Sequence, residues 1–326
     1  MSLKKALALI KKNKIFLIST HLHPEADGIG AELAFLSLLK KIGKQGYIVN
    51  ESAVPPECGF LPGIEQVWPL TKKTQSFDCA VFLDCADMSR AGKVAGLNRE
   101  NVPTLNIDHH ISNNRFASVN WVDPKACSTC EMVCRLYREL RAPIDAETAL
   151  TLYAGIVVDT GSFRYSNTNS RCHAIAASFI GKGIRPNAVY RSLFENNCFS
   201  DMQALGRILL TIKRASEGKI VWVNIRYNTK GKTRPGVDLA EIMLGLMRSI
   251  KGVELAMVFK EIDGRKNRVR INFRSQTSFD CNYLASFFGG GGHRNASGAT
   301  VLGDFSVVSK NVIARAKILM EKGGVK

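Results

Sequence analysis

Three short apolar runs that each end in acidic or imidazole side chains constrain the fold of this chain most strongly. They are "KIFLISTHLHPEAD" (14–27), "FDCAVFLDCAD" (77–87) and "VPTLNIDHH" (102–110). Helical spacing follows the first run in "GIGAELAFLSLLKKIGK" (28–44), and "QGYIVN" (45–50) then predicts a short strand. Strands that alternate with helices predict an α/β fold with a mostly parallel sheet. Ligands bind beyond the carboxyl ends of such strands, so we expect the three polar ends to form one site.

The remainder of the chain predicts a helical linker and a smaller second α/β domain. Residues 126–183 have a mainly helical pattern, and Pro186 opens a second helical tract that we interpret as the linker. Alternating apolar segments follow at 220–227, 254–262 and 267–275, with helices expected near 238–250 and 280–288. We therefore predict a catalytic domain over 1–185, a linker over 186–217 and a substrate-binding domain over 218–326.

Charge and cysteine content limit the classes of function. The net charge is +17, and residues 201–326 hold 22 Lys and Arg against 10 Asp and Glu, which favours an anionic ligand. Nine cysteines, an odd number in a long chain, argue against a secreted disulfide framework, so we expect a cytoplasmic protein. Cys127, Cys130 and Cys134 share one helical face but lack an obvious fourth ligand, which favours buried small side chains over a metal site. No apolar run reaches the length of a membrane span.

The polar strand ends and one further acid carry the candidate chemistry. These side chains are His21, Glu25, Asp27, Asp84, Asp108, His109, His110 and, within the apolar run "GIVVDTGSF", Asp159. Each alone has an ordinary alternative as a helix cap or a hydrogen-bonded polar group. Converging carboxylates would repel one another unless cations were present, and mixed carboxylate–imidazole ligation suits manganese, magnesium or iron. Two such cations about 3.5–4 Å apart suit in-line attack on phosphorus.

These motifs resemble the DHH phosphoesterase family with its DHH-associated C-terminal domain. The matching segments are "HLHPEAD", "FLDCAD", "IDHH", "DTGSF" and "GGGGHRNASG", which occur in the order of the family. The length of the chain is most similar to the stand-alone NrnA type, whose members degrade very short oligoribonucleotides and dephosphorylate pAp. The resemblance implies a metal-dependent phosphodiesterase or phosphatase that binds two divalent cations, either Mn²⁺ or Mg²⁺, with Mn²⁺ preferred.

The resemblance also implies a role for each motif residue. One cation would be held by His21, Glu25 and Asp84, and the other by Asp27, Asp84, His109 and Asp159. Asp108 would orient His109, while His110 would face the substrate phosphate or the leaving oxygen. Glu25 stands where the family usually has Asp. Its side chain is one methylene longer and can still reach a metal, but we expect it to shift the metal preference or to weaken the first cation site.

The second domain is expected to supply the substrate contacts. The residues implied are Arg274, Ser275, Gly290, Gly291, Gly292, His293 and Arg294. We expect an activated hydroxide to attack phosphorus in short single-stranded RNA or in a mononucleotide phosphate, with no membrane partner and with a homodimer left open. Two alternatives remain: a phosphodiesterase of cyclic dinucleotides or their linear products, and a non-catalytic nucleotide or RNA binder. Only the substitution at Glu25 supports the second alternative.

Overall fold

The computed structural model describes residues 2–71, 75–98, 102–226, 239–262, 267–276 and 278–321. The chain divides into two compact units, Met1–Asn196 and Asn197–Lys326. The division falls inside the tract interpreted as a linker. Among the described residues, no helix has both the length and the apolar character needed to cross a membrane.

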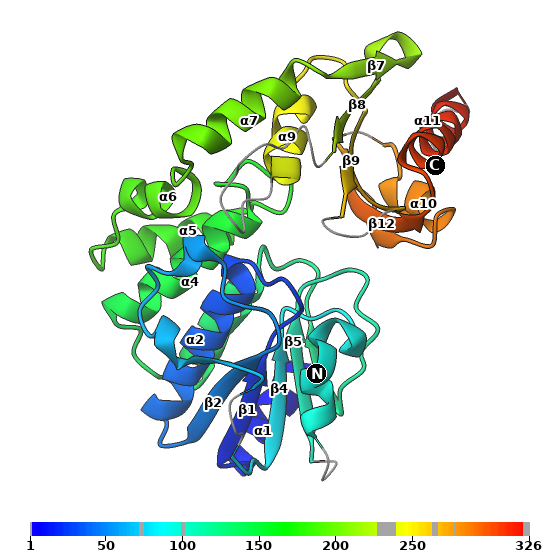
Figure 1. Cartoon of the computed structure of the whole chain (residues 1–326). Coiled ribbons are helices and arrows are strands. Elements are labelled where there is room, and N and C mark those ends of the chain that lie inside the picture. Colours follow the sequence, from blue (N-terminus) through cyan, green and yellow to red (C-terminus); the bar gives the residue numbers. More distant parts are fainter. Residues whose placement is uncertain are drawn as a thin grey trace. The chain divides into compact units, whose positions relative to one another are not determined.

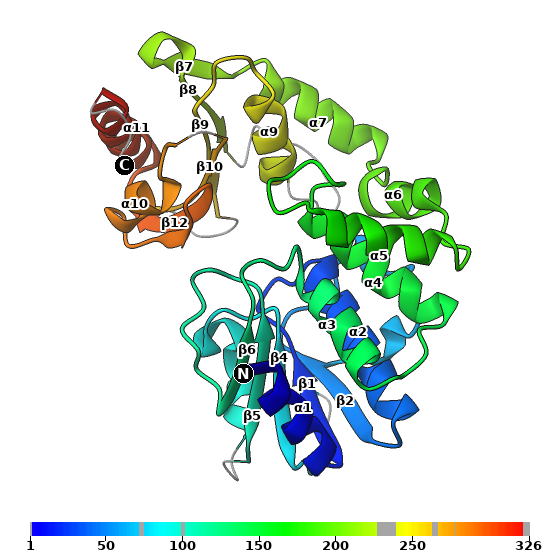
Figure 2. The ribbon, with the colours of Figure 1, turned by 180° about the vertical axis from the view of Figure 1, so that it is seen from behind.

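The first unit is a parallel sheet covered by helices (Figures 1 and 2). Its strands are β1 (Ile15–Ser19), β2 (Gln45–Asn50), β3 (Val67–Pro69), β4 (Cys79–Leu83), β5 (Thr104–Asp108) and β6 (Val119–Val122). They lie in the order β3-β2-β1-β4-β5-β6, and every neighbouring pair is parallel. The predicted α/β class is therefore confirmed. The order reverses between β1 and β4, and such a reversal places a crevice at the carboxyl ends of the strands.

The two faces of this sheet have separate cores because successive side chains of a strand point in opposite directions. Phe16 and Ile18 of β1 pack with the helices of one face, whereas Leu17 packs on the other face with a 3₁₀ segment over Met88–Leu97. The helices of this unit are α1 (Ser2–Lys12), α2 (Ala26–Lys41), α3 (Thr129–Glu139), α4 (Ala146–Asp159), α5 (Ser170–Ile180) and α6 (Pro186–Phe194).

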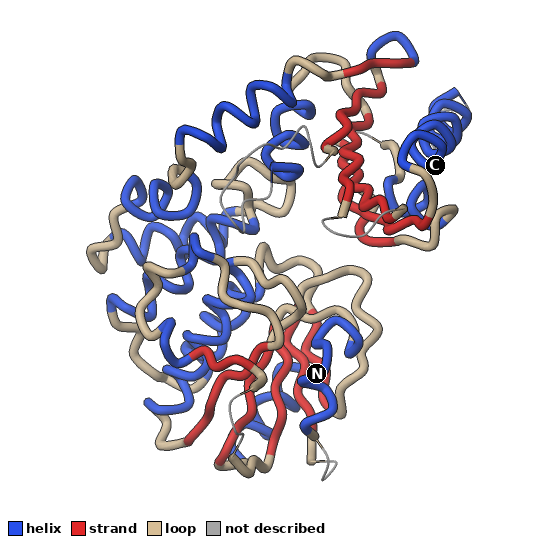
Figure 3. The backbone as a smooth tube through the Cα atoms, in the orientation of Figure 1, coloured by secondary structure: helices blue, strands red, loops and turns tan. Residues whose placement is uncertain are grey.

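The second unit is built on a mixed sheet with helices on both faces (Figure 3). Its strands are β7 (Lys213–Ala215), β8 (Ile220–Ile225), β9 (Leu255–Glu261), β10 (Arg268–Ser275), β11 (Gly291–His293) and β12 (Ala296–Leu302). They lie in the order β11-β12-β10-β9-β8-β7, in which only the β8–β9 pair among the described strands is parallel. Its helices are α7 (Phe199–Leu209), α9 (Leu239–Arg248), α10 (Cys281–Ser286) and α11 (Phe305–Glu321).

The helical tract expected through 217 ends earlier than predicted. Helix α7 stops at Leu209, and Lys213–Ala215 form the edge strand β7, in which Ala215 pairs antiparallel with Ile220. The segment "KRA" has no apolar pattern, because two of its three residues are Lys and Arg, so its sequence did not predict a strand. It forms a strand because it pairs with β8. Charged side chains are typical of exposed edge strands.

Candidate metal centre

Three neighbouring strands deliver most of the expected site residues to one edge of the first sheet. His21 follows β1 by two residues, Asp84 follows β4 directly, and Asp108 ends β5. Because β4 lies between β1 and β5, these ends are adjacent. The structure thus brings the three polar strand ends together at the reversal of strand order.

Asp84 holds a backbone conformation that is uncommon for a side-chain-bearing residue. Its φ is 54°, in the left-handed region that Asp and Asn tolerate better than most residues. Its N–H donates to the Ile107 carbonyl at 3.0 Å, and its Oδ1 accepts from Thr129 Oγ1 at 3.2 Å. These contacts hold the buried carboxylate among the histidines at the strand ends.

Asp27 and Asp159 reach the same place from helices. Asp27 is the second residue of α2, and its carboxylate accepts from the N–H groups of Thr129 (2.7 Å) and Cys130 (2.9 Å) in the first turn of α3. Asp159 is the last residue of α4. Gly155 of α4 lies against Asp27: an added Cβ there would sit 2.9 Å from Asp27 Oδ1. The close approach of α2 and α4 therefore helps to set the position of Asp27.

The ligand atoms form two overlapping groups. Asp84, His109 and His110 form one, and Asp27, His109 and Asp159 form the other; the ligand atoms of each lie within 4.8 Å of one another. His109 Nε2 is 3.2 Å from Asp159 Oδ2 and 3.6 Å from Asp84 Oδ1. His21 adds a third imidazole, with its Nε2 3.5 Å from Asp84 Oδ2. This oxygen-and-imidazole donor set fits a divalent cation such as Mn²⁺ or Mg²⁺.

Two histidines have a ring nitrogen already engaged. His21 Nδ1 is 2.7 Å from the Leu22 carbonyl, so Nδ1 carries the proton and Nε2 is free to face Asp84. His110 Nδ1 is 2.7 Å from Asp108 Oδ1. A hydrogen bond at one ring nitrogen fixes the tautomer, as expected for metal-binding histidines. In His110 the engaged nitrogen is also the one nearest to Asp84, at 3.6 Å, so His110 suits a metal less well than His21 does.

Asp108 differs from the expectation that it orients the His109 ring. Its fully buried carboxylate accepts from the backbone N–H of His109 at 2.9 Å and contacts the ring of His110. Asn113 Nδ2 donates to the other carboxylate oxygen at 2.6 Å. The carboxylate points back along its own loop, so it orients His110 instead. The role of Asn113 could not be predicted from the sequence pattern, because it depends on the loop after His110 folding back towards Asp108.

The charges of the cluster are unbalanced without a cation. Burial alone would lower the pKa of His109, but the carboxylates of Asp159 and Asp84 outweigh it and raise that pKa to about 9. Burial raises the pKa of Asp159 well above its ordinary value, and its buried Oδ2 accepts no hydrogen bond from the residues that the structure describes. Burial also acts to raise the pKa of Asp84, but contacts with His21 and the other imidazoles lower it. Without a cation, the negative charge of these carboxylates is balanced by protons on the carboxylates and imidazoles. A bound cation would replace those protons.

Glu25 lies outside both groups of ligand atoms. It is exposed and occupies the N-cap of α2, where its side chain makes no capping hydrogen bond. Its role as a ligand of one cation stays a prediction. Asp87, by contrast, caps the 3₁₀ segment that follows it, since its Oδ1 accepts from the Ser89 N–H at 2.7 Å.

In the second unit, Arg274 and Ser275 are less open than expected. Arg274 Nη2 pairs with Glu241 Oε2 at 2.8 Å, and its Nη1 donates to the Phe273 carbonyl at 3.1 Å. Ser275 is buried, and its N–H donates to the Asn295 carbonyl at 2.9 Å. A phosphate would have to compete with Glu241 for the guanidinium of Arg274.

The glycine run also differs from a free loop. Gly291–His293 form the short strand β11, which pairs with β12. A Cβ on Gly290 would overlap the carbonyl oxygen of Gly298, and the Gly292 N–H donates to Asn282 Oδ1 at 2.9 Å. The Arg294 Nη2 donates to the Ser278 carbonyl at 3.1 Å. The close approach of Gly290 to β12 therefore explains that glycine, while substrate contact by this run stays a prediction.

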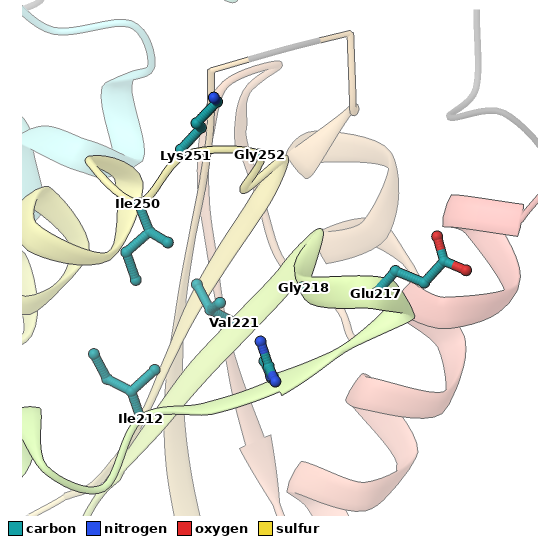
Figure 4. A pocket seen from close by; sticks show the side chains of 8 residues that line it. Ile212, Glu217, Gly218, Val221, Ile250, Lys251 and Gly252 are labelled. Carbon is teal, nitrogen blue, oxygen red and sulfur yellow. The ribbon is translucent and has the colours of Figure 1, made fainter.

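Two other features lie outside the two groups of ligand atoms. Cys127, Cys130 and Cys134 are buried, and all nine cysteines are free thiols. A cavity of about 300 Å³ lies in the second unit, where Ile212, Val221 and Ile250 line it together with charged residues (Figure 4). No member of either ligand group lines this cavity.

Comparison with known proteins agrees with this geometry. Residues 15–156 match the N-terminal domain of the DHH family, and residues 224–306 match the DHHA1 domain. The chain is 31% identical to the bifunctional oligoribonuclease and PAP phosphatase NrnA of Thermus thermophilus, over 88% of this chain and 84% of that protein. It is 25% identical to the protein of that name from Bacillus subtilis, over 87% of this chain and 88% of the other. An exopolyphosphatase-related protein of Bacteroides fragilis has the same fold, with a TM-score of 0.89, 24% identity and coverage of 98% and 97% of the two chains.

Proposed function

Because the chain belongs to the DHH family of phosphoesterases, we propose that it hydrolyses phosphoester bonds in short oligoribonucleotides, in pAp, or in both. The observation that carries the proposal is the convergence of Asp27, Asp84, His109 and Asp159 at one sheet edge. Two relatives named as oligoribonuclease and PAP phosphatase support the substrate class, since the similarity extends over most of each chain.

We propose that these residues hold two divalent cations, with Mn²⁺ preferred to Mg²⁺. His21, Glu25 and Asp84 would hold one, and Asp27, Asp84, His109 and Asp159 the other. When bound, such cations supply Lewis-acid chemistry, because they lower the pKa of water towards about 7 and stabilise charge on phosphate oxygens. The arrangement of Asp84 supports a shared ligand, since its two carboxylate oxygens face different histidines, His21 and His109.

The other residues of the first unit would position the substrate. The buried Asp108 carboxylate, fixed by Asn113, holds the His110 ring through Nδ1. We propose that the His110 ring, held in this way, faces the substrate phosphate or the leaving oxygen. A group held in place before the reaction needs no reorganisation as charge develops.

The second unit would add phosphate contacts through Arg274, His293 and Arg294. A cationic surface of this kind suits an anionic substrate, and the excess of Lys and Arg over Asp and Glu in residues 201–326 supports it. The domain boundaries predicted from the sequence, a homodimer and a cytoplasmic location stay predictions.

A substrate panel tests the proposal. The purified chain with Mn²⁺ is assayed on di- to pentaribonucleotides, pAp and cyclic-di-AMP, and a parallel series contains EDTA. We expect metal-dependent release of mononucleotides from the short RNAs, of AMP from pAp, or of both. Turnover confined to cyclic-di-AMP would replace the proposed substrate class, and the absence of turnover on every member would favour a binding protein.

A further inference from the structure

The turn that follows Asp159 presents a cation and an aromatic ring beside the metal centre. Helix α4 ends at Asp159, and the backbone then takes a left-handed conformation at Gly161, Ser162 and Phe163, with φ of 54°, 59° and 63°. Two successive non-glycine residues in this region are unusual, and such strained backbone clusters at functional sites.

Hydrogen bonds hold this turn in one shape. The Ser162 N–H donates to the Val157 carbonyl at 2.7 Å, and the Phe163 N–H donates to Thr160 Oγ1 at 3.0 Å. The Tyr165 N–H donates to the Thr160 carbonyl at 3.0 Å. Side chains carried by such a turn are positioned before any ligand arrives, which lowers the ordering cost of binding.

The side chains of Arg164 and Tyr165 are both anchored on Gly161. Arg164 Nε donates to the Gly161 carbonyl at 2.7 Å. The phenol end of Tyr165 covers the Cα of Gly161, since a Cβ there would overlap Cζ and lie 2.5 and 2.6 Å from Cε1 and Cε2. Even so, Tyr165 is 43% exposed, Arg164 is exposed, and Arg164 makes no ion pair within the part of the chain that the structure describes.

This anchor lies next to the centre. Gly161 follows Asp159 by two residues, a span of at most about 7 Å, and Asp159 Oδ2 is 3.2 Å from His109 Nε2. A guanidinium binds phosphate oxygens in a forked geometry, and an exposed aromatic ring stacks on the face of any base. A short nucleotide chain offers both groups, a base and a second phosphate, close to the phosphate that is cleaved.

We propose that residues 161–165 form a nucleotide-binding turn, in which Tyr165 stacks on a base and Arg164 binds a phosphate that is not cleaved. The inference rests on the proposed function and assigns part of the substrate selectivity to the first unit. The competing explanation is structural: Tyr165 would only cover Gly161, and Arg164 would only brace the turn.

Three dinucleotide substrates distinguish these explanations. They are diadenylate with a 5′-phosphate, diadenylate without it, and an abasic analogue in which tetrahydrofuran replaces each nucleoside sugar and base. The variants are Tyr165→Ala, Tyr165→Phe, Arg164→Ala and Arg164→Lys. Tyr190→Ala is the matched control, because Tyr190 is 41% exposed but lies on α6 against Phe194.

For Tyr165→Ala we expect the ratio of kcat/KM on diadenylate to kcat/KM on the abasic analogue to fall about tenfold, through KM, since one stacked base is lost. Tyr165→Phe and Tyr190→Ala should keep the parent ratio. Arg164→Ala should remove the preference for the 5′-phosphorylated substrate, and Arg164→Lys should restore part of it.

Equal losses on the base-bearing and abasic substrates, together with weaker Mn²⁺ binding in calorimetry, would assign Tyr165 a structural role and overturn the proposal. An unchanged ratio would overturn it as well. If the parent hydrolyses none of the three substrates, the proposed function fails, while equilibrium dialysis of diadenylate against the same variants still decides whether the turn binds nucleotide.

Discussion

Replacing Gly155 by alanine tests whether the contact between α2 and α4 sets the position of Asp27. An added Cβ would overlap Cys130 Sγ and would lie 2.9 Å from Asp27 Oδ1 and 3.0 Å from Asp27 Cα. Asp27 cannot move away easily, because two N–H groups of α3 donate hydrogen bonds to its carboxylate. We therefore expect the two helices to separate and the carboxylate to leave its place in the cluster.

The magnitude follows from two opposing effects. Alanine is favoured over glycine inside a helix by roughly 1 kcal/mol. Overpacking a well-packed core costs typically about 1–3 kcal/mol. For Gly155→Ala we expect the overpacking cost to exceed the helix preference, with a net loss of up to about 2 kcal/mol in the free energy of unfolding. The displacement of Asp27 should also weaken Mn²⁺ binding by about tenfold or more, the lower end of the effect seen when a metal ligand loses its support.

Gly206→Ala is the matched control. Gly206 lies inside α7, and, apart from the backbone of that helix, no atom of the described residues lies within 4 Å of its added Cβ, so only the helix preference remains. We expect a gain of up to about 1 kcal/mol and unchanged Mn²⁺ affinity. Urea unfolding reports the stability of each unit, and calorimetry reports the metal. A Gly155→Ala protein that is as stable as Gly206→Ala and binds Mn²⁺ like the parent would refute the reasoning.

Four further predictions concern single residues. Asp84→Asn, which keeps a side chain suited to φ 54°, should lower Mn²⁺-dependent turnover by about a hundredfold or more without loss of fold, checked by circular dichroism and the nuclease assay. Glu25→Asp should keep activity, whereas Glu25→Ala should weaken one of two Mn²⁺ sites in calorimetry; two unaltered sites would show that Glu25 is not a ligand. Arg274→Ala should raise KM for dinucleotides, and catalytic efficiency should fall from two- to five- to twenty-four-nucleotide RNA; equal efficiency on the longest RNA would favour a processive exonuclease. Burial raises the pKa of Glu32 well above its ordinary value. Ionisation of Glu32 therefore opposes folding once the pH exceeds its pKa in the unfolded chain. Glu32→Gln should stabilise the protein at pH 8 more than at pH 4.

Most of the first sheet could be predicted from the sequence, because the local strand patterns agree with the positions of the polar residues that follow them. The β-branched and apolar runs predicted β1, β4 and β5, and the polar residues at their ends predicted the shared edge. Strands β3 and β6 were not predicted, because each is only three or four residues long and takes its place from the neighbouring strand. Short strands of this kind carry too few residues for a periodic pattern.

In the site, too, features set by neighbouring residues could be predicted, whereas contacts with residues distant in the chain could not. The identity of Asp27, Asp84 and His109 as candidate ligands could be read from their motifs. The N–H donors of α3 that fix Asp27 could not, because they lie more than a hundred residues away in the chain. The true partner of Asp108 depends on the side-chain direction at a strand end, which spacing alone does not determine.

Anomalous diffraction from crystals grown with Mn²⁺ tests the central claim most directly. We expect two manganese peaks about 3.5–4 Å apart at the carboxyl ends of β1, β4 and β5, with Asp84 between them and His109 beside one. A single peak bound without Asp84, or peaks confined to another part of the chain, would contradict it.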